Sequence, residues 1–140
     1  MLVLWSIAMQ SLLMVGLGGF LGANARYILS TWVARHITKL LGLSLPVGTL
    51  FVNATGSLLL AFVITWWSSR VDVPRNIQLL VGMGFFGSYT TFSTFANESI
   101  ALLQRGQWSD ALGNIVLTNA ICLAGVIVGV ALGQRFFAAG

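Results

Sequence analysis

Gly84-Phe85-Phe86-Gly87-Ser88-Tyr89-Thr90-Thr91-Phe92-Ser93-Thr94-Phe95 is the stretch that decides how this chain folds. It lies in an uncharged segment, residues 76–97, and a helix that spans a bilayer needs about 20 such residues. Its glycines and its run of hydroxyl side chains nevertheless make it a poor apolar helix. Because lipid cannot hydrogen-bond freed backbone groups, we predict a broken helix here that is buried in protein or lines a water-filled cavity.

The composition is that of an integral membrane protein. Of the 140 residues, 57% are hydrophobic and only 7% are charged, whereas a soluble domain carries about 25% charged residues. Uncharged windows lie at residues 2–25, 40–69, 76–97 and 111–134. We therefore predict an all-α membrane protein with a single domain over residues 1–140 and four spans, at about 8–32, 46–68, 76–104 and 109–135. The third span has its midpoint at Thr90, so its break is expected near the centre of the bilayer.

Charge and cysteine content argue against several other classes of protein. The net charge of +4 comes from Lys and Arg residues scattered near the ends of the spans, which membrane flanks explain better than nucleic acid does. A single cysteine, Cys122, excludes an intramolecular disulfide and a cysteine metal cluster. The chain has no His/Ser/Asp set and no phosphate-binding loop, so we do not expect an enzyme.

Two sets of glycines predict close helix packing. Gly18 and Gly22 form a GxxxG pair in the first span, and Gly125, Gly129 and Gly133 recur every fourth residue in the last span. Small residues at this spacing let two helix backbones approach each other. We therefore expect both glycine faces to be buried against neighbouring helices.

Polar side chains within the spans have two possible interpretations, interhelical hydrogen bonding or an ion path. For Asn53, in the second span, the sequence leaves both open. Asn114, Thr118 and Cys122 recur every fourth residue and so form one stripe on the fourth span. We favour a polar track for this stripe, because its donors face no acidic partner.

Glu98 is the one acidic residue that is not plainly in a loop, and an ionisable group within a span is a functional candidate. The first and third spans run in the same direction. Arg26, which closes the first span, should therefore lie at the same end as Glu98. We expect a contact or a shared vestibule between the two.

The distribution of basic residues gives no clear orientation. With four spans, Arg70, Arg75 and Arg135 lie on one side, and Arg26, Arg35, Lys39 and Arg105 on the other. Orientation follows an excess of Lys and Arg in cytoplasmic loops, and here the excess is minimal. We predict insertion in both orientations and an antiparallel homodimer whose two-fold axis lies in the membrane plane near Thr90.

Three motifs resemble those of the Fluc (CrcB-type) fluoride channels, and together they cover nearly the whole chain. They read Gly18-Gly19-x-x-Gly22-Ala23-x-x-Arg26-Tyr27, then Pro46-x-Gly48-Thr49-Leu50-x-x-Asn53, and then Gly84-x-x-Gly87-x-x-Thr90-Thr91-Phe92-Ser93-Thr94-Phe95 followed by Glu98. The last motif is the specific one. The resemblance implies a dual-topology homodimer in the bacterial inner membrane, surrounded by lipid, with two pores that pass fluoride passively.

The resemblance also implies roles for individual residues. The pore residues that it implies are Arg26, Asn53, Phe92, Ser93, Thr94, Phe95, Glu98 and Thr118. A central structural sodium ion would be held by main-chain carbonyls of Gly87 and Thr90 from both subunits. In the fourth span, Asn114 and Cys122 stand where hydroxyl residues are expected, and Thr118 keeps one hydroxyl donor.

The chemistry of fluoride suits these residue types. Fluoride is small and tightly hydrated, so removing its water requires strong hydrogen-bond donors. Asn, Ser and Thr supply donors without a fixed charge that would trap the ion. Aromatic ring edges carry partial positive charge, so Phe92 and Phe95, three residues apart on one helix face, could contact an anion edge-on.

Two other functions remain open from the sequence. A small dual-topology exporter of organic cations needs a carboxylate within the membrane, and Glu98 is the only candidate because the first span holds no acid. A membrane scaffold built on the glycine faces would pass no ions. Fluoride efflux measured on liposomes separates both from a channel.

Overall fold

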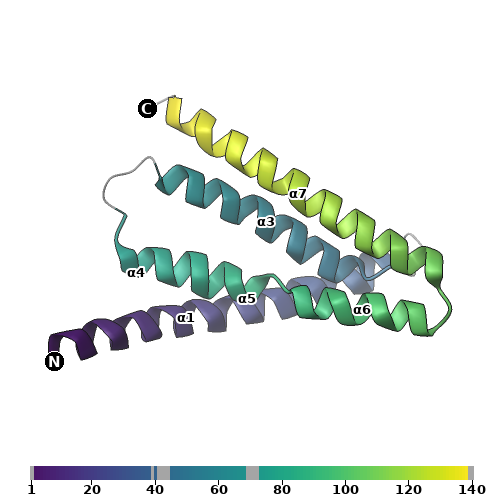
Figure 1. The fold of residues 1–140 in the computed structure, drawn as a ribbon, viewed down its shortest axis with the longest axis horizontal. Coiled ribbons are helices and arrows are strands. Elements are labelled where there is room, and N and C mark those ends of the chain that lie inside the picture. The colour runs from purple at the N-terminus through teal and green to yellow at the C-terminus, as the bar shows by residue number, and fades with distance from the viewer. Residues whose placement is uncertain (1, 39, 41–44, 69–72, 139–140) are drawn as a thin grey trace.

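A computed structural model describes residues 2–38, 40, 45–68 and 73–138. The regular elements in these ranges are all helical, which confirms the all-α prediction. Successive segments run in alternating directions, so that the start of α1 and the end of α7 lie at the same end of the molecule (Figure 1). Lys39 and Arg70, two of the basic residues near the ends of the predicted spans, lie outside the described residues.

The first two segments are long helices. Helix α1, Leu2–Val33, continues into a short π-helical turn, η1, at Ala34–Thr38. Helix α3 covers Val47–Trp67 and has Pro46 as its N-cap residue.

The third segment consists of several pieces, and the fourth is one long helix. The third begins with the turn α4, Arg75–Ile77, and passes through the π-helical stretch η2, Gln78–Phe86, into the turn α5, Gly87–Tyr89. Helix α6 then covers Phe92–Gln104. Helix α7, Trp108–Ala138, completes the fold.

Three of the described helices are long and apolar enough to cross a membrane: Ile7–Ile37, Val47–Trp67 and Trp108–Phe136. The third segment differs because helical structure stops at Tyr89 and resumes at Phe92. Between them the backbone is extended, with φ −87° and ψ 158° at Thr90, and φ −153° and ψ 109° at Thr91. The depth of this interruption in a bilayer stays a prediction.

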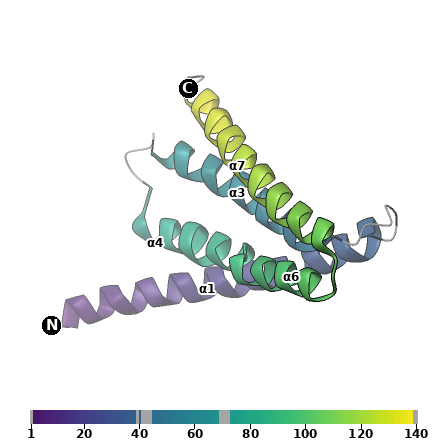
Figure 2. The same cartoon turned by 45° about the vertical axis from the view of Figure 1, so that its right-hand side comes forward.

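The helices form two pairs, each closed by a glycine face. Helix α3 packs against α7, and α1 packs against η2 and α5 (Figures 1 and 2). On α7, a methyl group added at Gly129 would collide with the carbonyl oxygen of Leu58, and one added at Gly133 would come within 2.7 Å of Thr65 Cβ. The sequence-based prediction of close packing at this face is confirmed.

The face of α1 that carries Gly18 and Gly22 lies directly on main-chain atoms of η2. A methyl group at Gly18 would collide with the carbonyl of Leu80, and one at Gly22 with the carbonyl of Phe85. From the other side, a methyl group at Gly84 would come within 2.9 Å of Gly18 Cα. Main-chain atoms of α1 and η2 are therefore in close contact at these glycines, as the GxxxG pair predicts.

Candidate functional site

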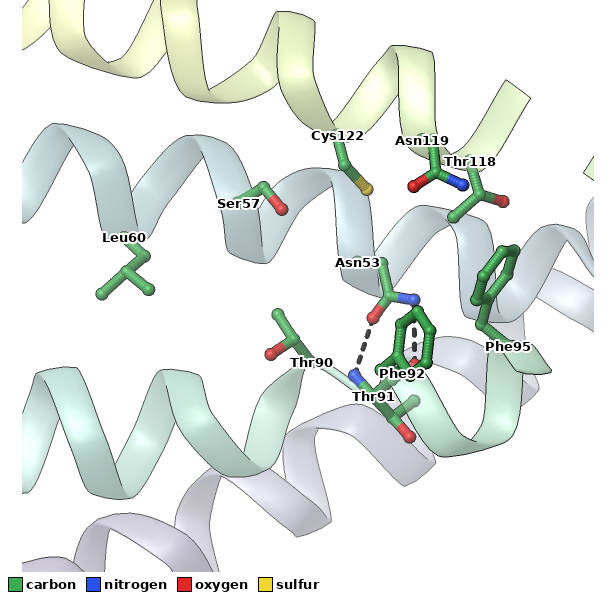
Figure 3. A pocket seen from close by; sticks show the side chains of 10 residues that line it. All are labelled: Asn53, Ser57, Leu60, Thr90, Thr91, Phe92, Phe95, Thr118, Asn119 and Cys122. Carbon is green, nitrogen blue, oxygen red and sulfur yellow. Dashed lines mark hydrogen bonds between the residues drawn. The ribbon is translucent and has the colours of Figure 1, made fainter. Parts of the chain in front are cut away.

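Asn53, on α3, holds the interruption of the third segment in place (Figure 3). Its Oδ1 accepts a hydrogen bond of 2.7 Å from the backbone N–H of Thr91, and its Nδ2 donates one of 3.1 Å to the carbonyl of Thr91. Both residues are buried. One side-chain amide therefore replaces the helical partners that the extended backbone has lost, and this requirement for internal partners is strongest at membrane depth.

The interruption also leaves carbonyl groups without their usual helical donors. In a continuous helix the carbonyl of Gly87 would accept from the N–H of Thr91, which is bound here to Asn53. The carbonyl of Thr90 would accept from the N–H of Thr94, which is bound here to the Thr91 hydroxyl at 3.2 Å. Main-chain oxygens of this kind are ligands that suit a hard cation, and the sodium site at Gly87 and Thr90 that the resemblance implies stays a prediction.

Thr91 starts helix α6 as its N-cap. Its hydroxyl accepts from the N–H of Thr94 and donates to the Thr94 hydroxyl at 2.9 Å, and the hydroxyl of Ser93 lies 3.3 Å away. A Thr in this position satisfies an orphan donor of the first turn. The predicted pore hydroxyls of Ser93 and Thr94 thus lie in one polar cluster at the N-terminus of α6.

A cavity of about 260 Å³ opens beside the interruption, and we call it the break cavity. It lies between α3, the third segment and α7 (Figure 3). Its lining residues are Asn53, Ser57, Leu60, Thr90, Thr91, Phe92, Phe95, Thr118, Asn119 and Cys122. These side chains offer amide, hydroxyl, thiol and aromatic groups and carry no formal charge.

Phe92 and Phe95 share the α6 side of the break cavity. Their ring centroids are 5.6 Å apart, with the ring planes inclined by 56°. Phe95 is only 7% exposed, whereas Phe92 is 77% exposed in the single chain. The two predicted pore aromatics are therefore in contact but have very different surroundings.

The polar stripe of α7 divides between the break cavity and the interior. Thr118 and Cys122 line the cavity. Asn114 does not; it is 1% exposed and donates a hydrogen bond of 2.9 Å to the Ser99 hydroxyl on α6. Asn114 therefore joins two helices and does not line this cavity, so a track through all three residues stays a prediction. A long span places donors on one face but does not reveal which of them meets a neighbouring helix.

Arg26 and Glu98 line separate cavities that adjoin. The Arg26 cavity, of about 200 Å³, and the Glu98 cavity, of about 320 Å³, have Ser30, Thr49 and Thr94 in common. Glu98 Oε1 accepts from the Thr49 hydroxyl at 2.8 Å, and Oε2 is buried without a hydrogen-bond partner among the residues that the structure describes. The two charged groups thus lie at the same end of the bundle, beside a common wall.

Sequence reasoning missed several polar residues of this region. Ser57 and Asn119 line the break cavity, and Ser99 connects α6 to α7. The hydroxyls of Thr55 and Tyr89 form a hydrogen bond of 2.9 Å just before the interruption. Ser57 and Ser99 each lie a single helical turn or less from a residue that was singled out, so helical spacing alone would have drawn attention to them.

Comparison with known proteins shows which family the chain resembles. Residues 13–130 match the family model described as "CrcB-like protein, Camphor Resistance (CrcB)". A protein of Koribacter versatilis named fluoride-specific ion channel FluC is 43% identical over 121 residues, which cover 86% of this chain and 93% of the relative. A protein of the same name from Shewanella loihica is 42% identical, with coverage of 86% and 94%.

A third relative, from Methylococcus capsulatus, carries the same name and is longer. It is 40% identical over 125 residues, which cover 89% of this chain but 53% of the relative. The family model spans all of α3, the interruption and most of α1 and α7. On this match, and on relatives above 40% identity that are covered almost end to end, the chain belongs to the CrcB-like (Fluc) family.

Proposed function

We propose that this chain is a fluoride-selective ion channel, not an enzyme, that lets fluoride leave the cell passively across the bacterial inner membrane. The observation that carries the proposal is the break cavity. In a chain whose relatives are named fluoride-specific ion channels, it places two amides, several hydroxyls and an aromatic pair around a space without formal charge.

This lining suits an anion that must enter and leave quickly. Hydroxyl and amide groups can replace part of the water shell of fluoride, and a site without a fixed positive charge does not retain the ion. The rings of Phe92 and Phe95 add the positive edges of their quadrupoles. Arg26, at the neighbouring cavity, supplies the attraction that brings an anion toward this end.

The working unit we propose is an antiparallel homodimer with two pores. In support, the face around the interruption is open in one chain: Phe92 is 77% exposed, Met83 is 64% exposed, and nothing lies within 4 Å of a methyl group placed at Gly87. An inverted second copy would cover this face and complete each cavity. Residues of the interruption would then meet their own copies at the two-fold axis.

A sodium ion at that axis would be structural. The carbonyls of Gly87 and Thr90, which have lost their helical donors, would be doubled by the second copy to give four oxygen ligands around a hard cation. A buried cation there would join the subunits and favour anions nearby. Replacing sodium with N-methylglucamine on both sides of the membrane should then lower the fluoride flux and weaken the dimer.

The deciding experiment is fluoride efflux from liposomes that contain the purified protein, followed with a fluoride electrode. We expect rapid fluoride efflux, little chloride efflux, and the loss of most fluoride flux in Phe92→Ile or Phe95→Ile proteins that remain folded. Efflux no faster than from empty liposomes would overturn the proposal. Proton-coupled transport of an organic cation by the same liposomes would support an exporter instead.

Antiparallel assembly has a test of its own. A cysteine introduced at the exposed residue Gln104, in a protein whose native Cys122 is replaced with serine, can be labelled in cells with a membrane-impermeant maleimide. We expect about half of the protein to react from outside and the remainder only after permeabilisation. Complete labelling, or none, before permeabilisation would exclude dual topology.

A further inference from the structure

We propose that Asn114 is a positioning residue, which fixes Phe95 in the wall of the break cavity by way of Ser99. Asn114 Nδ2 donates to Ser99 Oγ at 2.9 Å, and Ser99 Oγ donates to the carbonyl of Phe95 at 2.8 Å. This chain of hydrogen bonds runs from α7 to the first turns of α6. Its effect on ion passage rests on the proposed function, whereas its effect on the position of the ring does not.

Burial makes this connection difficult to replace. Asn114 is 1% exposed, Ser99 is 4% exposed and Phe95 is 7% exposed, so water cannot substitute for a lost partner. A buried polar group without a partner costs more than an average hydrogen bond contributes. The arrangement of these three groups is therefore strongly specified.

Asn114 also reaches the opposite wall of the cavity. Its Oδ1 accepts a hydrogen bond of 3.3 Å from the hydroxyl of Thr118, a lining residue on its own helix. One amide group thus contacts the residue that holds Phe95 and a residue of the α7 wall. The separation between these two walls depends on a side chain that itself lies outside the break cavity.

Helix α6 needs such a lateral anchor. It starts immediately after the extended residues Thr90 and Thr91, so the helix before it does not fix its rotation. Phe95 lies on the first turn, where a small rotation of α6 would swing the ring away from the cavity. A pore that selects by the placement of its contacts tolerates little change of this kind, so we expect loss of the anchor to reduce discrimination between fluoride and chloride.

The test compares Ser99→Thr with Ser99→Val, two side chains of nearly the same shape of which only Thr keeps the hydroxyl. Efflux of fluoride and of chloride is measured on liposomes for both. We expect Ser99→Thr to keep the wild-type ratio of the two rates, and Ser99→Val to lower it about tenfold, the change that follows from about 1.4 kcal/mol in the barrier. Equal ratios in the two variants would overturn the proposal.

Two further proteins complete the test. Asn114→Leu should lower the ratio as Ser99→Val does, and the double variant should be no worse than Asn114→Leu alone, because both changes break the same connection. Asn24→Ala is the control: Asn24 donates to the carbonyl of Phe20 within its own helix, and the ratio of this variant should equal that of the wild type. Additive losses in the double variant would contradict a shared connection.

The position of the ring is measured independently of transport. With 4-fluorophenylalanine at position 95, the fluorine NMR signal should shift or broaden in Ser99→Val but not in Ser99→Thr. An unchanged signal in Ser99→Val would overturn the positioning role, even if the wild type conducts fluoride. A changed signal in a protein that conducts no fluoride would uphold that role and reject the proposed function.

Discussion

The two halves of the third segment are held to the bundle by different physical means. Before the interruption, η2 meets α1 through glycines, backbone against backbone, at Gly18, Gly22 and Gly84. After it, α6 is joined to α7 by the hydrogen bond between Ser99 and Asn114. Close packing at glycines holds the first half, and hydrogen bonds hold the second. The same kind of substitution should therefore affect the two halves in different ways.

The largest effect is expected at the close glycine packing between α1 and η2. In Gly22→Val, the new side chain would collide with the backbone of Phe85, which cannot move without separating α1 from η2. We expect a loss of about 3 kcal/mol in the free energy of unfolding and a poor yield of folded protein. Thermal unfolding in detergent measures this, with Gly16→Ala as the matched control because nothing lies within 4 Å of a methyl group there.

A smaller effect is expected at the boundary between the halves. Asn53→Leu keeps roughly the volume of the side chain but removes both partners of Thr91. We expect a loss of about 2 kcal/mol, because a buried N–H and a buried carbonyl lose their hydrogen bonds, together with faster hydrogen exchange at the Thr91 amide. Unchanged exchange in Asn53→Leu would show that other groups hold the interruption.

The aromatic pair sharpens the comparison within α6. Phe95→Ile changes a side chain that is 7% exposed, whereas Phe92→Ile changes one that is 77% exposed in the single chain. We expect Phe95→Ile to lower the free energy of unfolding by about 1.5 kcal/mol and Phe92→Ile to change it much less, while both reduce fluoride efflux sharply. If either variant kept wild-type stability and wild-type efflux, its residue would not be part of the pore.

The smallest effect is expected at the N-cap of α6. Thr91→Val keeps the shape of the side chain and the backbone contacts with Asn53, but it removes the hydroxyl that caps the Thr94 N–H. Loss of such a cap costs about 1 kcal/mol. Thr91→Ser, which keeps the hydroxyl, is the control and should unfold at the wild-type temperature.

Much of the packing could be predicted from the sequence because glycine spacing is a local signal. Gly18 and Gly22, and the series on α7, lie within one helix each, and any close neighbour must use that face. The end of α3 at Trp67 follows from similar local information, because tryptophan is typical of the ends of membrane spans.

The polar site could be predicted only in part, because its contacts join residues far apart in the chain. For Asn53 the sequence left interhelical hydrogen bonding and an ion path open. Its partner is the main chain of Thr91, and a pattern of side chains cannot predict a contact with main-chain atoms. The different environments of Asn114 and Thr118 depend on where α6 crosses α7. The N-cap at Thr91 was within reach, since a threonine before a short helix is a local signal.

The hold of Asn53 on main-chain atoms has a consequence for how this protein can change over evolutionary time. Because the amide recognises the peptide groups of residue 91 and not its side chain, any residue except proline at position 91 can keep this contact, whereas no change at position 91 can replace the amide of residue 53. This contact should therefore constrain the asparagine alone, while the constraint on residue 91 comes from its capping hydroxyl, and the two sites should show little covariation among descendants.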